Sequence, residues 1–517
     1  MATPREKFVE ALKSLNKLQE KSTVAIYTDE IPNRIHRELL VKNGFLKEVI
    51  KGWYIAANPN ERDGDTTSWY SSYWEFCVKF LEHKYGSNWC LSADQSLYMH
   101  AGNWSVPQQL FIKSPKGNNK PTPLPHNTSL FNLKADLPAA DQMVTIRGLR
   151  MYNLQASLIY SSASIYNKTG IDARTVLSLI RDASEVLPIL LEQGHTTIGG
   201  RLAGAFRNIQ RDRIADQIMD TMKQAGYDIR ENDPFQTKLE INLSPRENSP
   251  FVNRIKLMWL QMRENIINDF PPAPGLPKDH EAYLKNVDEV YVTDAYHSLS
   301  IERYKVTPQL IERVSSGKWD NKENVEDKQQ KDAMAARGYY QSFQVVKETI
   351  IKILNNANPG VQTDKDHQKW YRELFDPSVS AGILKASDLA GYRNNQVYIG
   401  GSKHVPLSVD AMRDAMPILF ELLENEPEAS VRAILGHFVF VFIHPYMDGN
   451  GRMGRFLMNV MLASGGYPWT VIPVEKRSEY MKALEQASAE QDISTLSQFM
   501  AYLVKEGLAG KPVAVLP

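Results

Sequence analysis

An apolar stretch that ends at a histidine and a glycine-rich loop constrains this chain more than any other feature. Residues 430–443 read SVRAILGHFVFVFI, which is too long for a strand. Because apolar residues face every direction, the pattern predicts a helix buried on all sides, and fourteen residues are too few to span a bilayer. Pro445 disfavours the helical conformation at His444, so the helix should end there and place the imidazole at the edge of a loop.

The twelve residues from His444 to Arg455 read HPYMDGNGRMGR. From about Asn450 the pattern is helical again, so the amides of residues 449–451 should lie at a helix N-terminus, which attracts anions. Arg452 lies three residues before Arg455 and therefore shares its helix face. The segment thus combines a polar loop, an amide-rich helix start and two guanidinium groups.

This inventory suits phosphoryl chemistry. His444 is a candidate general base because histidine ordinarily titrates near neutrality. Asp448 is a hard oxygen ligand that could hold Mg²⁺ together with phosphates, and the arginines could neutralise phosphate charge through forked hydrogen bonds. Each feature alone also has an ordinary interpretation, as a satisfied histidine or a simple turn. The segment GNGRMG matches the dinucleotide fingerprint, but a helix precedes it where that motif requires a strand, so we reject that interpretation.

The segment resembles the signature of the Fic family, H-x-F-x-D/E-G-N-G-R-x-x-R, with Tyr446 in place of the usual phenylalanine. The resemblance implies an all-α domain that transfers AMP from ATP to a hydroxyl of a target protein, a reaction called AMPylation. It implies that His444 deprotonates the target hydroxyl and that Asp448 binds Mg²⁺. It assigns the phosphates to five residues of the loop and the following helix, namely Gly449, Asn450, Gly451, Arg452 and Arg455.

A second segment, AYHSLSIERYKVTPQL, extends this resemblance. Some Fic proteins carry an inhibitory helix that reads S/T-x-x-x-E-G/N, whose glutamate pairs with the second arginine of the signature and blocks the ATP γ-phosphate. Ser298 and Glu302 fit this pattern, so the resemblance implies an ion pair between Glu302 and Arg455. Arg303 replaces the Gly or Asn, which leaves the conformation of the helix end open. The alternative is a surface glutamate on an amphipathic helix.

A third segment, GYRNNQVYIGGSKHVPLS, contains a short β-prone run bounded by Asn395 and Gly400. The run consists of Val397, Tyr398 and Ile399, and it predicts a hairpin. In the Fic family such a flap lies over the catalytic loop and aligns the target by main-chain pairing. An ordinary surface hairpin is the alternative.

Residues 1–60 predict short helices followed by a hairpin, which is the outline of a winged helix. This part resembles the winged-helix start of abortive-infection type IV antitoxins. If it binds DNA, basic residues of the helix and the wing would make the contacts, namely Arg34, Arg37, Lys42, Lys47 and Lys51. The alternative is a solvated face of a protein-contact module, because Glu38 and Glu48 are interleaved with these cations.

The 517 residues predict a mainly α protein of several domains. We expect a winged helix at 1–60, a mixed α+β module at 61–230, a polar and proline-punctuated linker at 231–250, and an all-α Fic domain at 251–510. The 60 basic and 60 acidic residues cancel, so net charge indicates no class of partner. Two cysteines cannot form a disulfide framework and the chain starts without an apolar signal core, so we expect a cytoplasmic protein without membrane contact.

Together these features predict a protein adenylyltransferase that uses ATP and Mg²⁺, acts on a protein hydroxyl and is inhibited by Glu302. The signature is equally compatible with removal of AMP or with another nucleotide. A second hypothesis is a DNA-binding regulator whose Fic domain only modifies itself or removes AMP. Homodimers occur among similar proteins, although no stretch of this sequence shows a self-complementary face.

Overall fold

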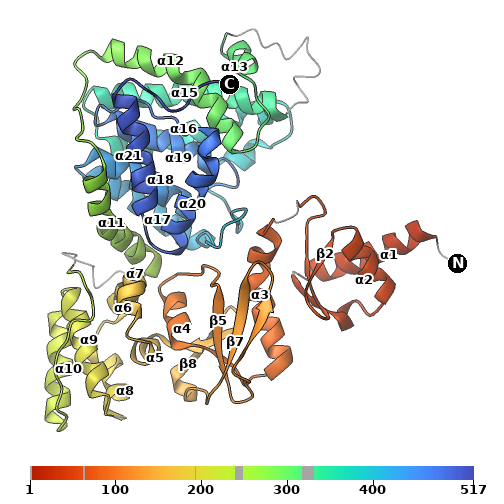
Figure 1. The fold of residues 1–517 in the computed structure, drawn as a ribbon, viewed down its shortest axis with the longest axis vertical. Helices are drawn as coiled ribbons and strands as arrows, with labels where there is room; N and C mark the ends of the chain where they lie inside the picture. The colour runs from red at the N-terminus through yellow and green to blue at the C-terminus, as the bar shows by residue number, and fades with distance from the viewer. Residues whose placement is uncertain (1–2, 22, 62–64, 193, 239–248, 317–330) are drawn as a thin grey trace. The chain divides into compact units, whose positions relative to one another are not determined.

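The computed structural model describes residues 3–21, 23–61, 65–192, 194–238, 249–316 and 331–517 (Figure 1). The chain forms two compact units, an N-terminal unit of residues 1–250 with 398–405, and a C-terminal unit of residues 251–397 with 406–517. Helices dominate the described residues, which confirms the predicted mainly α class. None of the described helices combines the length and apolar character needed to cross a bilayer. Residues 239–248 of the expected linker lie outside the described residues.

The N-terminal unit begins with two helices and a three-stranded antiparallel sheet of order β1-β3-β2. Its elements are α1 (Pro4–Gln19), β1 (Ala25–Tyr27), α2 (Arg34–Lys42), β2 (Leu46–Ile50) and β3 (Trp53–Ala56). The side chain of Asn33 accepts a hydrogen bond from the Ile35 amide at 3.0 Å and so starts α2. Strands β2 and β3 turn at Lys51 and Gly52, where Gly52 adopts a φ of 82°.

The rest of this unit is a mixed module in which a four-stranded sheet packs with helices. The sheet has the order β4-β5-β7-β6, with β5 and β7 parallel, and a separate hairpin joins β8 to β9. The strands are β4 (Cys90–Leu91), β5 (Gln109–Ser114), β6 (Lys120–Leu124), β7 (Thr128–Lys134), β8 (Met143–Ile146) and β9 (Leu149–Tyr152). The helices are α3 (Thr67–Tyr85), α4 (Ala93–His100), α5 (Leu154–Tyr160), α6 (Ile165–Lys168), α7 (Gly170–Leu179), α8 (Leu187–Glu192), α9 (Thr196–Asn208) and α10 (Asp212–Gln224).

The C-terminal unit consists of helices, and α18 and α19 pack against each other at its centre (Figure 1). Helix α17 packs on α18, while α15 and α16 both contact α19. The helices are α11 (Pro250–Asp269), α12 (His280–Ile301), α13 (Pro308–Ser315), α15 (Lys331–Leu354), α16 (Pro359–Ser380), α17 (Val409–Asn425), α18 (Ala429–Ile443), α19 (Asn450–Ala463), α20 (Arg477–Ala489) and α21 (Ser494–Leu508).

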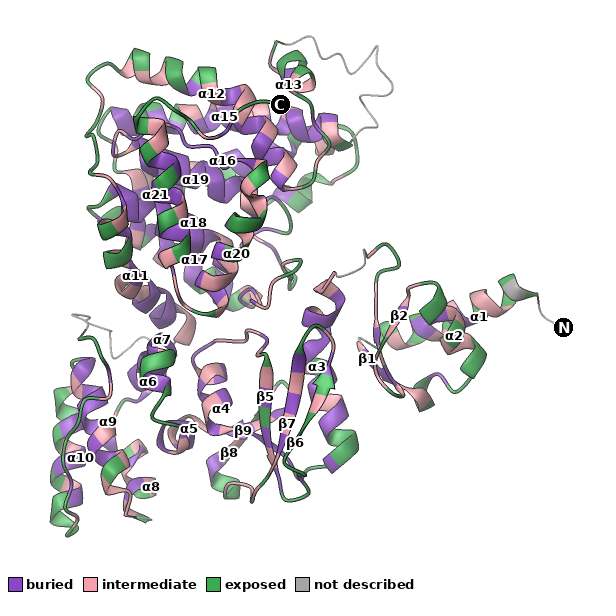
Figure 2. Ribbon diagram, in the orientation of Figure 1, coloured by how far each residue is buried: buried purple, intermediate pink, exposed green. Residues whose placement is uncertain are grey.

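Burial explains why α18 and α19 hold the loop between them so firmly. Every residue of α18 except Val441 is buried, and every residue of α19 except Gly451 is buried (Figure 2). Both helices match the sequence prediction, including the end of α18 at Ile443 and the start of α19 at Asn450. The loop of residues 444–449 is therefore anchored at both ends in the core of the unit.

Candidate active site

The loop begins at His444, which closes α18. Its amide donates to the Phe440 carbonyl at 3.0 Å, and its backbone adopts the left-handed conformation with a φ of 57°. A residue with a Cβ loses roughly 1–2 kcal/mol in this conformation. The helix therefore stops at His444, as the following Pro445 predicts, and the chain turns into the loop.

The hydrogen bond of the His444 ring fixes its tautomer. Nδ1 lies 3.1 Å from the carbonyl oxygen of Val441, which only accepts hydrogen bonds. Nδ1 therefore carries the proton, and Nε2 is the unprotonated nitrogen. Burial lowers the pKa of His444 to about 4. The hydrogen bond to Val441 raises this pKa, and the positive charge of Arg393 lowers it further. The imidazole is thus neutral at pH 7 with a nitrogen able to accept a proton.

Asn450 and Tyr446 shape the middle of the loop. The Asn450 side chain accepts from the Tyr446 amide at 2.9 Å and donates to the Tyr446 carbonyl at 2.8 Å. The Tyr446 ring is buried and stacks on Tyr371 with ring centres 3.7 Å apart, so it fills the space expected for an aromatic plug. Both ends of the Asn450 side-chain amide therefore hold the main chain of Tyr446 in place.

Gly449 allows the loop to enter α19. It adopts a φ of 83°, and a Cβ at this position would lie 2.8 Å from the Phe375 ring, so only glycine fits. The Gly449 amide donates to Asp448 Oδ1 at 2.6 Å. The amides of residues 450–452 form the first turn of α19 and have no carbonyl one turn earlier in the helix. They make the anion-attracting helix start that the sequence predicts.

Both signature arginines are buried, with Arg452 1 % and Arg455 3 % exposed. Among the described residues, Nε of Arg452 and Nη1 of Arg455 are buried without a hydrogen-bond partner. The Arg452 guanidinium lies over the rings of Tyr304 and Phe375, 5.2 and 5.0 Å from their centres. A buried donor without an acceptor is costly, so these atoms suit an anionic ligand such as a phosphate.

The ion pair expected from the inhibitory pattern is present. Arg455 Nη2 lies 2.8 Å from Glu302 Oε1, and Arg455 also donates to the Oγ and the carbonyl of Ser298 at 2.9 and 3.0 Å. Burial opposes ionisation of Glu302, but the charges of Arg455, Arg452 and Arg477, with the hydrogen bond from Arg455, together hold the pKa of Glu302 below its ordinary value. A Cβ on Gly451 would lie only 2.3 Å from Glu302 Oε1. The carboxylate therefore occupies the space beside the start of α19.

The structure also shows how α12 ends without the Gly or Asn of the pattern. Arg303 itself adopts the left-handed conformation, with a φ of 68°. Its amide donates to the Ser300 carbonyl at 2.9 Å, and the Tyr304 amide donates to the Leu299 carbonyl at 3.1 Å. This pair of bonds is the Schellman motif, in which glycine is the usual left-handed residue. The helix end keeps its shape, and Arg303 bears the backbone strain.

Asp448 offers one carboxylate to a cation. Its side chain is 66 % exposed, and Oδ2 lies 3.4 Å from Arg452 Nη2. Within the described ranges, no three or more His, Cys, Asp or Glu side chains are grouped as metal ligands. A single carboxylate fits Mg²⁺, which usually keeps water molecules and takes its remaining ligands from substrate phosphates.

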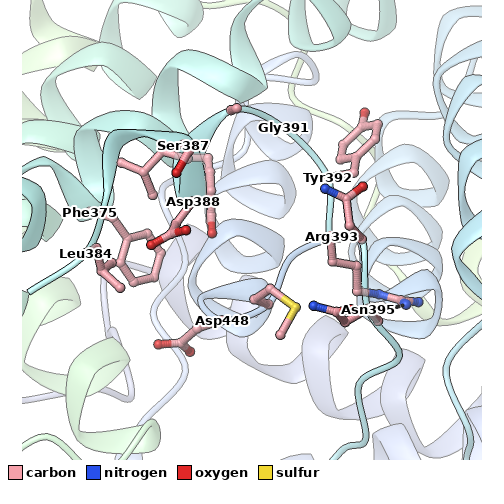
Figure 3. Close-up of a pocket in the computed structure, with 14 residues that line it drawn as sticks. Phe375, Leu384, Ser387, Asp388, Gly391, Tyr392, Arg393, Asn395 and Asp448 are labelled. Atoms are coloured by element: carbon pink, nitrogen blue, oxygen red, sulfur yellow. Dashed lines mark hydrogen bonds between the residues drawn. The ribbon is translucent and has the colours of Figure 1, made fainter.

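A cavity of about 570 Å³ opens beside Asp448 and Met447 (Figure 3). Tyr371 and Phe375 of α16, Leu384 and residues 387–395 line the rest of it. Nothing in the sequence predicted this cavity, because residues 384–395 carry no periodic pattern. In Figure 3, Asp448 lies across the cavity from Arg393, the residue that follows Tyr392 in the chain.

Comparison with known proteins identifies this part of the chain. Residues 363–462 match the sequence model of the Fic/DOC family. These residues are similar to a Fic/DOC domain. The matched residues include the whole segment from His444 to Arg455, whereas Glu302 lies outside them.

Curated relatives are similar over longer segments. "Protein adenylyltransferase Fic" of Drosophila sechellia is 39 % identical over 271 residues, 50 % of this chain and 51 % of the relative. The protein of the same name from Drosophila willistoni is 40 % identical over 114 residues, 21 % of this chain and 22 % of the relative. The chain thus spans about half or less of the length of these relatives.

Two solved structures are also similar. A Fic domain containing signaling protein from Bacteroides thetaiotaomicron has a TM-score of 0.33 and 18 % identity, covering 50 % of this chain and 100 % of that one. Fic-1 from C. elegans has a TM-score of 0.35 and 17 % identity, covering 68 % of this chain and 97 % of that one.

The hairpin expected at residues 397–399 is wrong. The structure describes no strand between residues 390 and 408, and the backbone there is irregular. Val397 is buried in the C-terminal unit, while Tyr398 is 42 % exposed and belongs with Ile399 to the N-terminal unit. A side-chain hydrogen bond, rather than strand pairing, brings the two ends of this segment together: Gln396 Nε2 donates to the Pro406 carbonyl at 2.8 Å.

The five basic residues expected to face DNA differ in their availability. Arg34 pairs with Glu38 at 2.7 Å, Arg37 donates to main-chain carbonyls, and Lys47 pairs with Glu61. Lys42 and Lys51 are exposed to solvent.

Proposed function

We propose that the Fic/DOC domain is a protein adenylyltransferase that moves AMP from ATP to a Ser, Thr or Tyr hydroxyl of a target protein. One observation carries the proposal: a neutral His444 with an unprotonated Nε2 borders the start of α19, where two buried arginines hold donor atoms without partners. The curated relatives that bear the name protein adenylyltransferase Fic give further support.

In the proposed reaction the target hydroxyl attacks the α-phosphorus of ATP. The new bond joins the hydroxyl oxygen to AMP, the bond to the β-phosphate breaks, and pyrophosphate leaves. Nε2 of His444 takes the hydroxyl proton, which contributes on the order of 10²- to 10⁴-fold to the rate. Arg452, Arg455 and the amides of residues 450–452 neutralise the phosphate oxygens, and such fixed charges contribute at least as much as proton transfer.

Asp448 would hold Mg²⁺ in this scheme, because its exposed carboxylate belongs to the same loop as His444. When bound, Mg²⁺ supplies positive charge that offsets the charge of the phosphates. The lone carboxylate implies that the ion and the nucleotide bind together.

We also propose that Glu302 inhibits the reaction. The same guanidinium of Arg455 that would bind a phosphate is engaged by the Glu302 carboxylate at 2.8 Å. Gly451 makes room for this carboxylate beside the first turn of α19. ATP phosphates and Glu302 would therefore compete for one cation and one space.

The proposal is tested by incubating the chain with Mg²⁺ and ATP labelled at either the α- or the γ-phosphate. AMP transfer places only the α-label on protein, whereas phosphate transfer places only the γ-label there. Parallel reactions with GTP, CTP and UTP test the nucleotide, and release of AMP from labelled protein tests the reverse activity. Label confined to the band of the chain itself would favour self-modification. Absence of α-label from the wild type and from Glu302→Gly would contradict the proposal.

A second proposal concerns residues 1–60, which would form a winged-helix module that contacts DNA. Its support is the order of α2 and the β2–β3 ribbon, with exposed Lys42 on the helix and exposed Lys51 at the turn. Because neighbouring carboxylates and carbonyls already engage three of the five cations, the contact would be weak. Retention of the full chain on duplex DNA should weaken steeply with salt, and Lys42→Glu with Lys51→Glu should abolish it. Equal retention of the double variant would contradict DNA binding at this face.

A further inference from the structure

Arg393 is a buried cation that binds only main-chain carbonyls. It is 2 % exposed, and its three side-chain bonds go to His444, Asn395 and Leu407. Among the described residues, no carboxylate lies within ion-pair distance of it. Burying a guanidinium is costly unless it is hydrogen-bonded, and here the Arg393 side chain donates to three carbonyls.

One of these side-chain bonds, together with a main-chain bond of Arg393, holds the catalytic loop. Arg393 Nε donates to the His444 carbonyl at 2.8 Å, and the Arg393 amide donates to the Pro445 carbonyl at 2.9 Å. They fix the two peptide groups that follow the left-handed His444, which is where the chain bears strain. A strained residue persists when its surroundings over-determine it, and Arg393 supplies that constraint.

The other two side-chain bonds hold the two ends of the segment 396–406. Nη1 donates to the Asn395 carbonyl at 2.8 Å, and Nη2 donates to the Leu407 carbonyl. The flat, rigid fork of the guanidinium thus joins three chain segments in one plane. Tyr392, next to Arg393, is tied in turn to α16, because its hydroxyl lies 2.9 Å from His367 Nε2.

We propose that Arg393 is a positioning residue for the transfer reaction: it locks His444 in its left-handed conformation and sets the ends of the segment 396–406 at a fixed place relative to the base. This inference rests on the proposed function and deepens it.

The test compares three variants of the full chain. Arg393→Lys keeps the charge but loses the fork, Arg393→Gln loses both, and Arg413→Lys is the control, since Arg413 is an exposed arginine that donates to the neighbouring Asn394. With ATP affinity unchanged, both Arg393 variants should lower kcat for labelling about a hundredfold, the usual effect of a misplacement near 1 Å. Arg413→Lys should label like the wild type.

The pH profile separates positioning from simple structural support. The charged groups that act on His444 are Arg393, Glu302 and Asp448, and Arg393 is the cation among them that lowers the pKa of His444. Arg393→Gln should therefore move the acid limb of kcat to higher pH, while Arg393→Lys should leave it in place. An equal loss of rate in both variants with an unshifted limb would overturn the inference.

A readout without catalysis keeps this test apart from the proposed function. Titration of ¹⁵N-labelled histidine by NMR, without nucleotide or Mg²⁺, follows the His444 ring directly, and its signal is assigned by its loss in His444→Ala. In Arg393→Gln the His444 midpoint should rise above that of the wild type. An unchanged midpoint would overturn the inference even if AMP transfer were absent, and a raised one would support it. If Arg393→Gln fails to fold, Arg393→Lys tests the inference instead. A lower labelling rate with an unchanged unfolding midpoint would support positioning, and a wild-type rate would overturn it.

Discussion

Two helices of the C-terminal unit end at a residue in the left-handed conformation, and neither residue is glycine. Helix α18 ends at His444 with a φ of 57°, and α12 ends just before Arg303 with a φ of 68°. The His444 peptide is held by Arg393 and its ring by Val441, whereas the Arg303 side chain is exposed. The difference indicates that the left-handed conformation of His444 orients its imidazole ring, while that of Arg303 only ends the helix.

The largest effect that sharpens this comparison is expected from His444→Ala. Without a base, transfer should fall at least 10²- to 10⁴-fold, while ATP binding stays intact. Labelling with α-labelled ATP and a separate nucleotide-binding titration measure the two properties. The control is His126→Ala, which changes another histidine with a left-handed backbone, φ 54°, in the N-terminal unit. Wild-type labelling by His444→Ala would show that the strained ring is not the base.

The next effect concerns Glu302, which α12 presents immediately before Arg303. Glu302→Gly removes the hydrogen-bonded ion pair to Arg455, and such bonds contribute about 1.5–3 kcal/mol, so labelling should rise roughly ten- to a hundredfold. Initial labelling rates at low ATP measure the change. Glu20→Gly is matched to it, because Glu20 is also the residue that ends a helix, α1. Unchanged labelling by Glu302→Gly would remove the inhibitory role.

A smaller effect is expected from pH. Because burial lowers the pKa of His444 to about 4, the base should stay unprotonated well below neutrality. Transfer should vary little between about pH 6 and 8 and decline as the pH falls towards the pKa of His444, where the ring gains a proton. Initial rates at saturating ATP, with circular dichroism at each pH to exclude unfolding, measure this. A half-maximal rate near the ordinary histidine pKa would contradict the burial of the ring.

The smallest effect is expected from Arg303→Gly. Glycine relieves the left-handed strain but gives the unfolded chain more freedom, so the net gain should be about 1 kcal/mol, or about 2–4 °C in the thermal midpoint. Arg303→Ala is the control, because it removes the same side chain but keeps the Cβ. Differential scanning calorimetry measures both. An equal shift in the two variants would assign the effect to the lost charge rather than to the backbone.

The sequence predicted the centre of the site because local signals there agree. Apolar residues on every face define α18, Pro445 ends it, and the glycines of DGNG precede a helix start that must attract anions. The pairing of Glu302 with Arg455 was implied by the resemblance of Ser298 and Glu302 to the inhibitory pattern, although more than 150 residues separate the partners.

The sequence failed where structure depends on distant partners. Val397, Tyr398 and Ile399 favour a strand, but a strand forms only beside another, and none of the described strands pairs with them. Nor did the sequence reveal that the Asn450 side chain binds the Tyr446 backbone. Arg393 gave no signal, because an arginine in a polar loop looks the same in sequence whether it is solvated or buried.

Gly451 has a consequence for any attempt to separate Glu302 from the start of α19. A Cβ there would lie 2.3 Å from Glu302 Oε1 and 3.2 Å from Arg455 Nη1, so an added methyl group would disturb the carboxylate and the guanidinium together. Only a residue without a side chain leaves this space open to either a carboxylate or a phosphate.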